Sequence, residues 1–342
     1  MAPLGKALSL QLVESSSSGL PKHVYRGVVD ADWVVGSIPH GGYLLGLLVM
    51  ASMKSQQQTK HKDPIHVTAH FMQPTARSEY SIEVQVIRTG SRFTNLTTNL
   101  IQNGETTVLT HMVFGTLLEF DAPPSSHKYQ DISPSHPLSR PIPLTIHPRT
   151  ASLSDMHFKY GKFRQYVRRV IDDGIRSRNV AKLAASPGSH VGGLESGSWW
   201  ELNGEDEELH LSMMPFFADV FENTPTVMSD IHGNGTPAMW YPTMVMTLEF
   251  KRKLPRKGTP GFSNRALGVY ANGAFLDHGR HDIHGEIWSA PSCIGQADGR
   301  DPNDESWKKD MRCIAVTGQM ALSVSLEVNQ KKGEKKTAGP KL

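Results

Sequence analysis

Hydrophobic and polar positions along the chain predict a helix followed by several strands, twice over. In the first half, a Gly/Pro-rich turn at residues 36–42 precedes apolar side chains that recur at helical spacing until Lys54 and a run of glutamines. This pattern predicts a buried helix of roughly four turns over residues 42–56. Four strands are expected to follow, at residues 66–73, 80–88, 93–102 and 107–118.

Alternation within these segments indicates a sheet with one buried face. Apolar residues at positions 80, 82, 84 and 86 alternate with polar ones, which is the period of two that a half-buried strand shows. Between the third and fourth strands, Asn103 and Gly104 favour a two-residue hairpin. The first half therefore reads as one helix followed by an antiparallel sheet.

The second half repeats this order. A strand that begins at Trp199 precedes an apolar helical segment at residues 212–221, and further strands are expected at residues 243–252, 266–274, 281–288 and 313–328. We interpret the repeat as an internal duplication, because an isolated unit would leave an apolar helix flank or a sheet edge exposed. The predicted fold class is α+β, with two central helices each wrapped by an antiparallel sheet and the two sheets joined into one.

Composition divides the chain into four parts. The two repeats are expected at residues 1–120 and 196–330. Between them, residues 121–195 are rich in Pro, Ser and His and then in Gly and Ser, which predicts a linker and a loop. Within that segment, residues 158–169 fit either a strand or a short amphipathic helix. A basic, disordered tail is expected at residues 331–342.

Charge and cysteine content exclude several classes of protein. The net charge is +3, from 36 Lys and Arg against 33 Asp and Glu, and the last thirteen residues alone carry +4, from five Lys against one Glu. The rest of the chain is nearly neutral, which argues against a nucleic-acid-binding face and a membrane-adsorbing surface. Two cysteines, Cys293 and Cys313, fit a reducing compartment better than a disulfide framework.

The cellular location is predicted from apolar runs and from the termini. No apolar run approaches the ~20 residues that span a bilayer, and the N-terminus lacks a signal-peptide pattern, so we expect a cytoplasmic protein. The final Pro340, Lys341 and Leu342 differ from a peroxisomal Ser-Lys-Leu signal only at the first position, so peroxisomal import stays open. Assembly into a homo-oligomer also stays open.

Several short motifs occur in a characteristic order. They are Trp33, Gly36, Pro-His-Gly-Gly-Tyr at residues 39–43, Phe-x-x-Pro at 71–74, Arg-x-Gly-x-Arg at 88–92 and Gln-Asn-Gly at 102–104. Together they resemble the double hot-dog acyl-CoA thioesterase family, a branch of the thioesterase-like proteins related to acyl-CoA thioesterase II. The resemblance implies a hydrolase of acyl thioesters, with coenzyme A as the leaving group and no retained cofactor.

The resemblance also implies three catalytic residues. Relatives of acyl-CoA thioesterase II orient a water with an Asp on the second-half helix, a Thr that opens the next strand and a Gln on the last strand. These fall on Asp219, Thr243 and Gln319. The sequence departs from the family at Val245 and Met246, where the family has Asp and His, and by an insertion at residues 290–312. These departures bear on the substrate class more than on the chemistry.

Each of these residues also has a purely structural interpretation. Asp219 lies in an otherwise apolar helix, where an ionised carboxylate is costly to bury without partners, but it could instead cap the helix beside Pro215. A β-branched residue such as Thr243 is common at a strand start. Gln319 lies among apolar residues, and a polar site explains a buried amide better than a core does.

Substrate-binding residues are expected at the start of the first helix. There the backbone N–H groups of Gly41 and Gly42 could stabilise the carbonyl oxygen as it gains charge, with His40 and Tyr43 beside them. Alternatively, the two glycines serve only a tight turn.

Histidines elsewhere give two further hypotheses. His111 aligns with Gln319 when Met320 is set on Met112, so it is a candidate for substrate binding. Histidines at positions 278, 281 and 284 have metal-like spacing, but along a strand positions 281 and 284 point to opposite faces, so no metal site is predicted.

Two other functions stay open beside thioester hydrolysis. One is a hot-dog dehydratase or cyclase of a biosynthetic pathway, which the departures from the family pattern favour. The other is a non-catalytic acyl-binding protein that keeps the pocket without turnover. Assays of acyl-CoA substrates by thiol release would separate the three.

Overall fold

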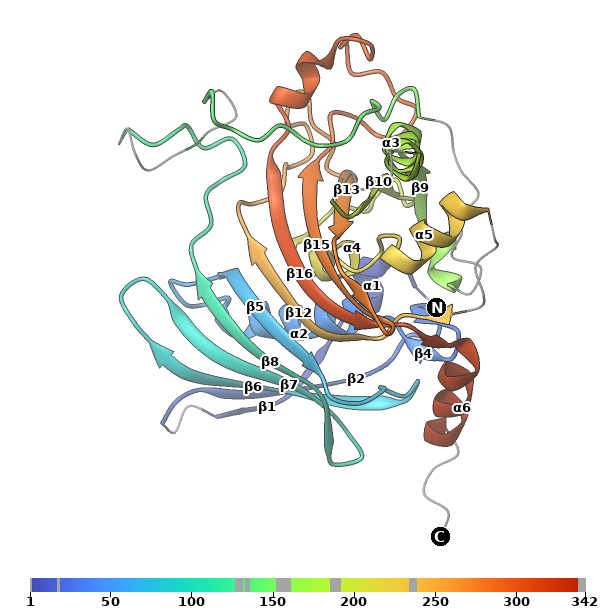
Figure 1. Cartoon of the computed structure of the whole chain (residues 1–342). Helices are drawn as coiled ribbons and strands as arrows, with labels where there is room; N and C mark the ends of the chain where they lie inside the picture. The colour runs from blue at the N-terminus through green and yellow to red at the C-terminus, as the bar shows by residue number, and fades with distance from the viewer. Residues whose placement is uncertain are drawn as a thin grey trace.

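One continuous antiparallel sheet runs through the whole molecule (Figure 1). The structure, a computed structural model, describes residues 2–16, 19–126, 132, 136–151, 161–184, 192–233 and 239–337. In spatial order, the strands of this sheet are β1 (Gln11–Ser16), β2 (Lys22–Val28), β6 (Glu79–Thr89), β7 (Thr94–Gln102), β8 (Glu105–Gly115), β5 (Asp63–Phe71), β12 (Thr243–Phe250), β16 (Cys313–Leu322), β15 (Arg280–Ser289), β13 (Ala266–Gly273), β10 (Leu194–Leu202) and β9 (Val167–Ile171), with β14 (Leu276–Asp277) beside β15.

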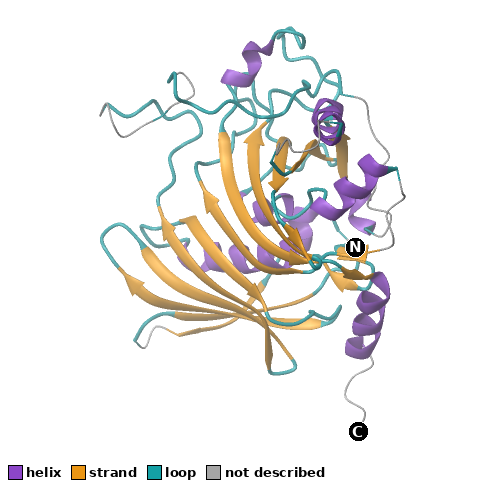
Figure 2. Ribbon diagram, viewed as in Figure 1, coloured by secondary structure: helices purple, strands orange, loops and turns teal. Residues whose placement is uncertain are grey.

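Two central helices lie together along one face of the curved sheet (Figure 2). They are α2 (Gly41–Gln56) in the first half and α4 (Met214–Phe217) in the second, and the halves join where β5 pairs with β12. Nearly every residue of α2 is buried or half-buried, as expected of a helix that is apolar all round. The predicted pair of helices wrapped by one antiparallel sheet is confirmed. Asn103 (φ 52°) and Gly104 (φ 77°) form the expected hairpin turn.

The second central helix is shorter than predicted. A helix was expected over residues 212–221, but a 3₁₀ turn at Leu211–Met213 leads into α4, which ends at Phe217. After it, the Asp219 N–H donates to the Phe216 carbonyl at 3.0 Å, which is the tighter 3₁₀ spacing. The predicted helix was too long because the spacing of apolar residues does not distinguish an α-helix from short 3₁₀ turns at its ends.

The segment at 121–195 is more than the linker predicted. It supplies the edge strand β9, the helix α3 (Asp173–Leu183) and a 3₁₀ turn at Lys162–Gln165, so the described part of 158–169 is neither one strand nor one helix. Together with the insertion at 290–312, the segment covers the outer face of the second-half sheet. Leu144, Trp199 and Trp307 belong to one buried cluster there. Both faces of β10 are therefore buried.

The described part of the carboxyl-terminal segment, up to residue 337, is helical, whereas a disordered tail was expected from residue 331. Strand β16 ends at Leu322, earlier than expected, and β17 (Val324–Ser325) then leads into α6 (Leu326–Thr337). Strand β17 pairs with β11 (Met239–Trp240), and α6 lies beside β4 (Ile38–Pro39), which pairs with β3 (Val34–Val35). Tertiary contacts thus support a lysine-rich helix that its own composition does not predict.

The remaining helices are short. They are α1 (Leu4–Ala7), α5 (Thr224–His232) and a 3₁₀ helix at Glu305–Lys309. Across the ranges that the structure describes, every helix is too short or too polar to cross a membrane. The Pro340, Lys341 and Leu342 tripeptide lies outside the described residues.

Candidate active site

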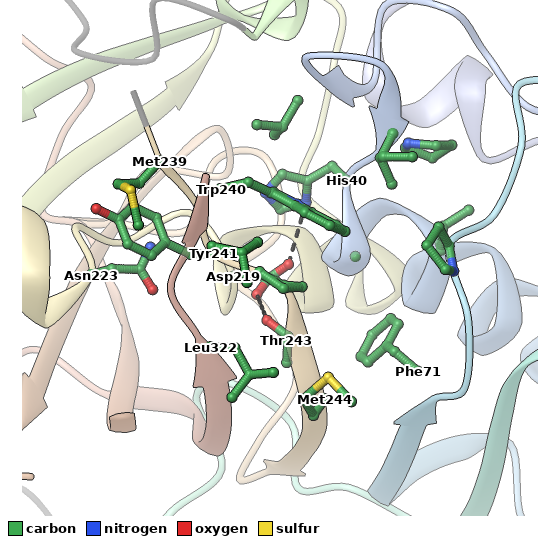
Figure 3. Close-up of a pocket in the computed structure, with 18 of the residues that line it drawn as sticks. His40, Phe71, Asp219, Asn223, Met239, Trp240, Tyr241, Thr243, Met244 and Leu322 are labelled. Atoms are coloured by element: carbon green, nitrogen blue, oxygen red, sulfur yellow. Dashed lines mark hydrogen bonds and ion pairs between the residues drawn. The ribbon is translucent and has the colours of Figure 1, made fainter. Parts of the chain in front are cut away.

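Asp219 lies where the two halves meet (Figure 3). It follows α4 of the second half, and its side chain is 10% exposed. Oδ2 accepts a hydrogen bond from the Gly42 N–H of α2 at 2.7 Å, and Oδ1 accepts one from the Thr243 hydroxyl at 3.2 Å. Free N–H groups and the positive end of the helix dipole both lie at a helix N-terminus. Helix α2 therefore stabilises the Asp219 carboxylate.

Glycine is required at position 42 because the two central helices approach so closely there. A Cβ on Gly42 would lie 2.3 Å from the Pro215 carbonyl oxygen and 2.8 Å from the Cβ of Asp219. The Gly42 N–H, predicted to serve the substrate carbonyl, is instead bonded to Asp219. That part of the prediction is wrong for Gly42, whereas Gly41 does line the cavity described below.

Thr243 and Gln319 complete the group from two neighbouring strands. Thr243 opens β12 beside a bulge, and Gln319 points inward from β16 with 7% of its surface exposed. The Gln319 Nε2 donates to the Ala218 carbonyl at 2.7 Å, which leaves Oε1 at 3.3 Å from the Thr243 hydroxyl. The three residues that the resemblance singled out therefore converge, with Thr243 within hydrogen-bond distance of both Asp219 and Gln319.

Burial is the largest influence on the pKa values of the two ionisable groups at the site, Asp219 and His40. His40, at the N-cap of α2, places Nδ1 3.5 Å from Asp219 Oδ2, which is longer than a normal hydrogen bond. Burial raises the pKa of the Asp219 carboxyl, although His40, the Gly42 N–H and Thr243 act to lower it. Burial lowers the pKa of His40, although Asp219 acts to raise it. A carboxylate whose pKa is raised is a stronger base than one in water, as proton abstraction requires.

Asp219 and Thr243 line a cavity of about 580 Å³ between the halves. Leu44 and Phe71 contribute to an apolar part of its wall. Polar side chains line another part, where the Thr226 hydroxyl donates to the Tyr241 hydroxyl at 3.0 Å. A cavity of this size, mostly apolar with a few polar groups, suits a small organic ligand.

Two predicted substrate-binding residues lie away from this cavity, so their prediction is wrong. Tyr43 is fully buried in the core, and its hydroxyl donates to the Ala7 carbonyl at 3.1 Å. His111 is exposed on the outer face of β8, where the inward neighbour is Met112. The alignment behind the His111 prediction was one residue out of register, and such a shift moves every side chain to the other face of the sheet.

Several cavity residues were missed because they come from segments without a motif. They are Arg169 on β9, Asn223 after Asp219, Trp240 and Tyr241 before Thr243, and Lys332 on α6. Only the aromatic pair gave a signal, since Trp and Tyr are enriched at interfaces, where one end of the side chain is apolar and the other is wet.

The three spaced histidines do not converge. His281 is buried with Nε2 3.1 Å from Asn223 Oδ1, whereas His278 and His284 are exposed. No cluster of three His, Cys, Asp or Glu side chains is arranged to hold a metal within the described residues.

Family profiles match both halves of the chain. The acyl-CoA thioesterase N-terminal domain matches residues 29–115, and the acyl-CoA thioesterase C-terminal domain matches residues 148–296. The chain belongs to the acyl-CoA thioesterase family. The C-terminal match includes Asp219 and Thr243 and ends before Gln319. The resemblance predicted from the motifs is confirmed.

Solved structures of this thioesterase family and fold cover nearly the whole chain. An acyl-CoA thioesterase II from Mycobacterium marinum is 14% identical with a TM-score of 0.61, and the alignment covers 94% of this chain and 98% of that one. A hot-dog protein from Alicyclobacillus acidocaldarius is 18% identical with a TM-score of 0.62, over 94% and 98% of the two chains. These similarities confirm the double hot-dog fold.

One sequence relative comes from a biosynthetic cluster. Ustilagic acid biosynthesis cluster protein orf2 of Mycosarcoma maydis is 30% identical over 87 residues. The match spans 25% of this chain and 23% of that protein, so the chain matches about a quarter of the length of this relative.

Proposed function

We propose that this protein hydrolyses an acyl-CoA or a related acyl thioester by direct attack of water. The observation that supports this most is the group of Asp219, Thr243 and Gln319 beside a cavity between the two halves. Asp219 and Thr243 line the cavity, so a water there can reach both side chains. The family match supplies the thioester as the substrate class.

The proposed reaction uses Asp219 as the general base. Its carboxylate takes a proton from water while the water oxygen bonds to the carbonyl carbon, and the carbon–sulfur bond then breaks. The proton passes to the departing sulfur, so the products are a carboxylic acid and a free thiol. Thr243 holds the water through its hydroxyl. Gln319, behind Thr243 and bonded to the Ala218 carbonyl, is a positioning residue.

Gly41 is the proposed donor to the carbonyl oxygen. It is the first residue of α2 and lines the cavity, and a backbone N–H at a helix N-terminus suits an oxygen that gains negative charge. Gly42 cannot serve both Asp219 and the substrate through one N–H.

Replacement of Asp219 by Asn tests the proposal. Asparagine keeps the shape and can still accept from the Gly42 N–H, but it cannot take a proton. We expect turnover of acyl-CoA, followed by thiol release, to fall by about two to four orders of magnitude. Asp277→Asn, at an exposed carboxylate that does not line the cavity, is the matched control. Near-normal turnover by folded Asp219→Asn would remove Asp219 from the mechanism.

A biosynthetic role is the second candidate, and the relative from the ustilagic acid cluster favours it. The substrate would then be a carrier-free intermediate of a pathway, and the reaction would be dehydration or cyclisation. Mass spectrometry of the products separates these reactions from hydrolysis. Binding of acyl-CoA with no product at all would instead indicate an acyl-binding protein.

A further inference from the structure

Helix α6 is fixed to the first half of the molecule by a buried side chain. Asn329 is fully buried, its Nδ2 donates to the Val35 carbonyl at 3.0 Å, and its Oδ1 accepts from the Ser37 N–H at 2.9 Å. Gly333 approaches Ser37 so closely that an added Cβ would lie 2.4 Å from the Ser37 Cβ. The helix is thus held on the β3–β4 hairpin, directly before His40 and α2 (Figure 1).

One face of α6 borders the cavity. Val328 and Lys332, one turn apart, both line it. Val324, which precedes the helix, pairs with Trp240 of β11, and both of these also line the cavity. The Lys332 ammonium lies 5.9 Å from the centre of the Trp240 ring, within reach of a cation–π contact.

The exposure of the lining residues locates the mouth of the cavity at α6. Deep lining residues such as Leu44 and Phe221 are 3% and 5% exposed. By contrast, Val328 is 37% and Met72 is 63% exposed, and Lys332 is exposed as well. The cavity is therefore open to solvent between α6 and the loop that follows β5.

Among the described residues that line the cavity, Lys332 is the accessible cation at this mouth. Arg169, the other Lys or Arg among the described lining residues, is 2% exposed and lies 3.1 Å from the Glu222 carboxylate. Asp230 on α5, an acidic residue, also lines the cavity. A phosphate group cannot be buried without a large desolvation cost, so the phosphates of a thioester carrier must stay near the mouth.

We propose that α6 forms the carrier end of the substrate site and that Lys332 recognises a phosphate of the carrier. The inference rests on the proposed thioesterase function and adds the region of the protein that binds the leaving group. The carrier class is a phosphorylated pantetheine, whose source is either coenzyme A or a 4′-phosphopantetheine arm.

The test compares one acyl group on three carriers: coenzyme A, 4′-phosphopantetheine and pantetheine without phosphate. Lys332→Ala should raise KM about two- to fivefold and Lys332→Glu about tenfold for phosphorylated carriers, at unchanged kcat, as expected for an exposed ion pair and its reversal. Both effects should shrink as salt is added. KM for acyl-pantetheine should not change.

Lys331→Ala is the matched control, because Lys331 is exposed on the same helix, lies 3.9 Å from Glu327 and does not line the cavity. An effect on both phosphorylated carriers assigns the pantetheine phosphate, and an effect on acyl-CoA alone assigns the nucleotide phosphates. Equal effects on all three carriers, or none, would overturn the inference. If the wild-type protein hydrolyses none of the three, the proposed function fails and takes the inference with it.

Discussion

The Thr243 hydroxyl has one proton and two acceptors within reach, Asp219 Oδ1 and Gln319 Oε1. When Asp219 is ionised, the proton is held by the carboxylate. When Asp219 is protonated, its O–H can donate to Thr243, and Thr243 can turn to Gln319. The hydrogen-bond chain therefore satisfies both protonation states of Asp219, which suits its proposed role of taking and returning a proton within one turnover.

Thr243→Val should lower kcat/KM about 10- to 100-fold, the worth of a hydrogen bond to a charged group. Under the proposed mechanism, activity requires the Asp219 carboxylate, so it should fall as the pH drops through the pKa of Asp219, which burial raises. Valine removes a donor to the carboxylate, so this acidic limb should move to higher pH. Thr243→Ser keeps the hydroxyl and should keep the wild-type limb. A pH–rate profile that is the same in both variants would contradict this role of Thr243.

At the scale of residues, the sequence predicted the polar centre better than the walls around it. Asp219 was conspicuous in an apolar helix, and family spacing carried the argument from it to Thr243 and Gln319. Asn223 and Lys332 have no such contrast with their neighbours, because polar residues at helix ends and in basic segments are usually solvated. Only the tertiary fold brings them to the cavity.

The contact between α2 and α4 depends on which glycine lies at which position. At Gly42, an added Cβ meets backbone atoms, including the Pro215 carbonyl oxygen at 2.3 Å, which cannot move alone. At Gly41, it meets only side-chain atoms, Asp219 Oδ2 at 3.0 Å and Phe71 at 3.4 Å. An alanine at position 42 therefore disturbs the packing of the two helices, and an alanine at position 41 disturbs the Asp219 carboxylate.

Gly42→Ala should therefore destabilise the protein by about 1–3 kcal/mol, the usual cost of overpacking, and lower the melting temperature. Gly41→Ala should leave the melting temperature close to wild type and lower turnover. Thermal denaturation and thiol-release assays on the two purified variants provide the comparison. Equal melting temperatures for the two variants would show that the helix contact is more pliable than the structure indicates.

Elements with a clear apolar period were predicted well, and those that depend on tertiary covering were not. Strands β5 to β8 fall within a few residues of their predicted ranges. The edge strands β1 and β9 and the helix α6 were missed because they are short or polar. The two strands are stabilised by pairing with the edge of the sheet, and α6 is stabilised by its contacts with the first half. The Pro- and Ser-rich composition of residues 121–195 likewise hid the strand and helix within them.

At the scale of the molecule, the two halves should unfold together. One buried cluster contains side chains of both, including Leu48 of α2 and Phe217 of α4, and β5 pairs with β12 across the junction. Urea unfolding followed by far-UV circular dichroism and by tryptophan fluorescence should give coincident transitions. Two separated transitions would mean that each half keeps a core of its own.

The helix-and-sheet fold is present in both halves, but the polar group of the candidate site is present in only one. Strands β5 and β12 end at Phe71 and Phe250, and Val67 and Met246 lie four residues before these ends. Their partners on the next strand are Met112 and Gln319, which are both buried. The place that holds an amide in one half holds a thioether in the other. Under the proposed chemistry, the stoichiometry is one reaction centre for each polypeptide. The second copy of the ancestral unit carries the reacting side chains, and the first copy supports them and supplies the backbone donor.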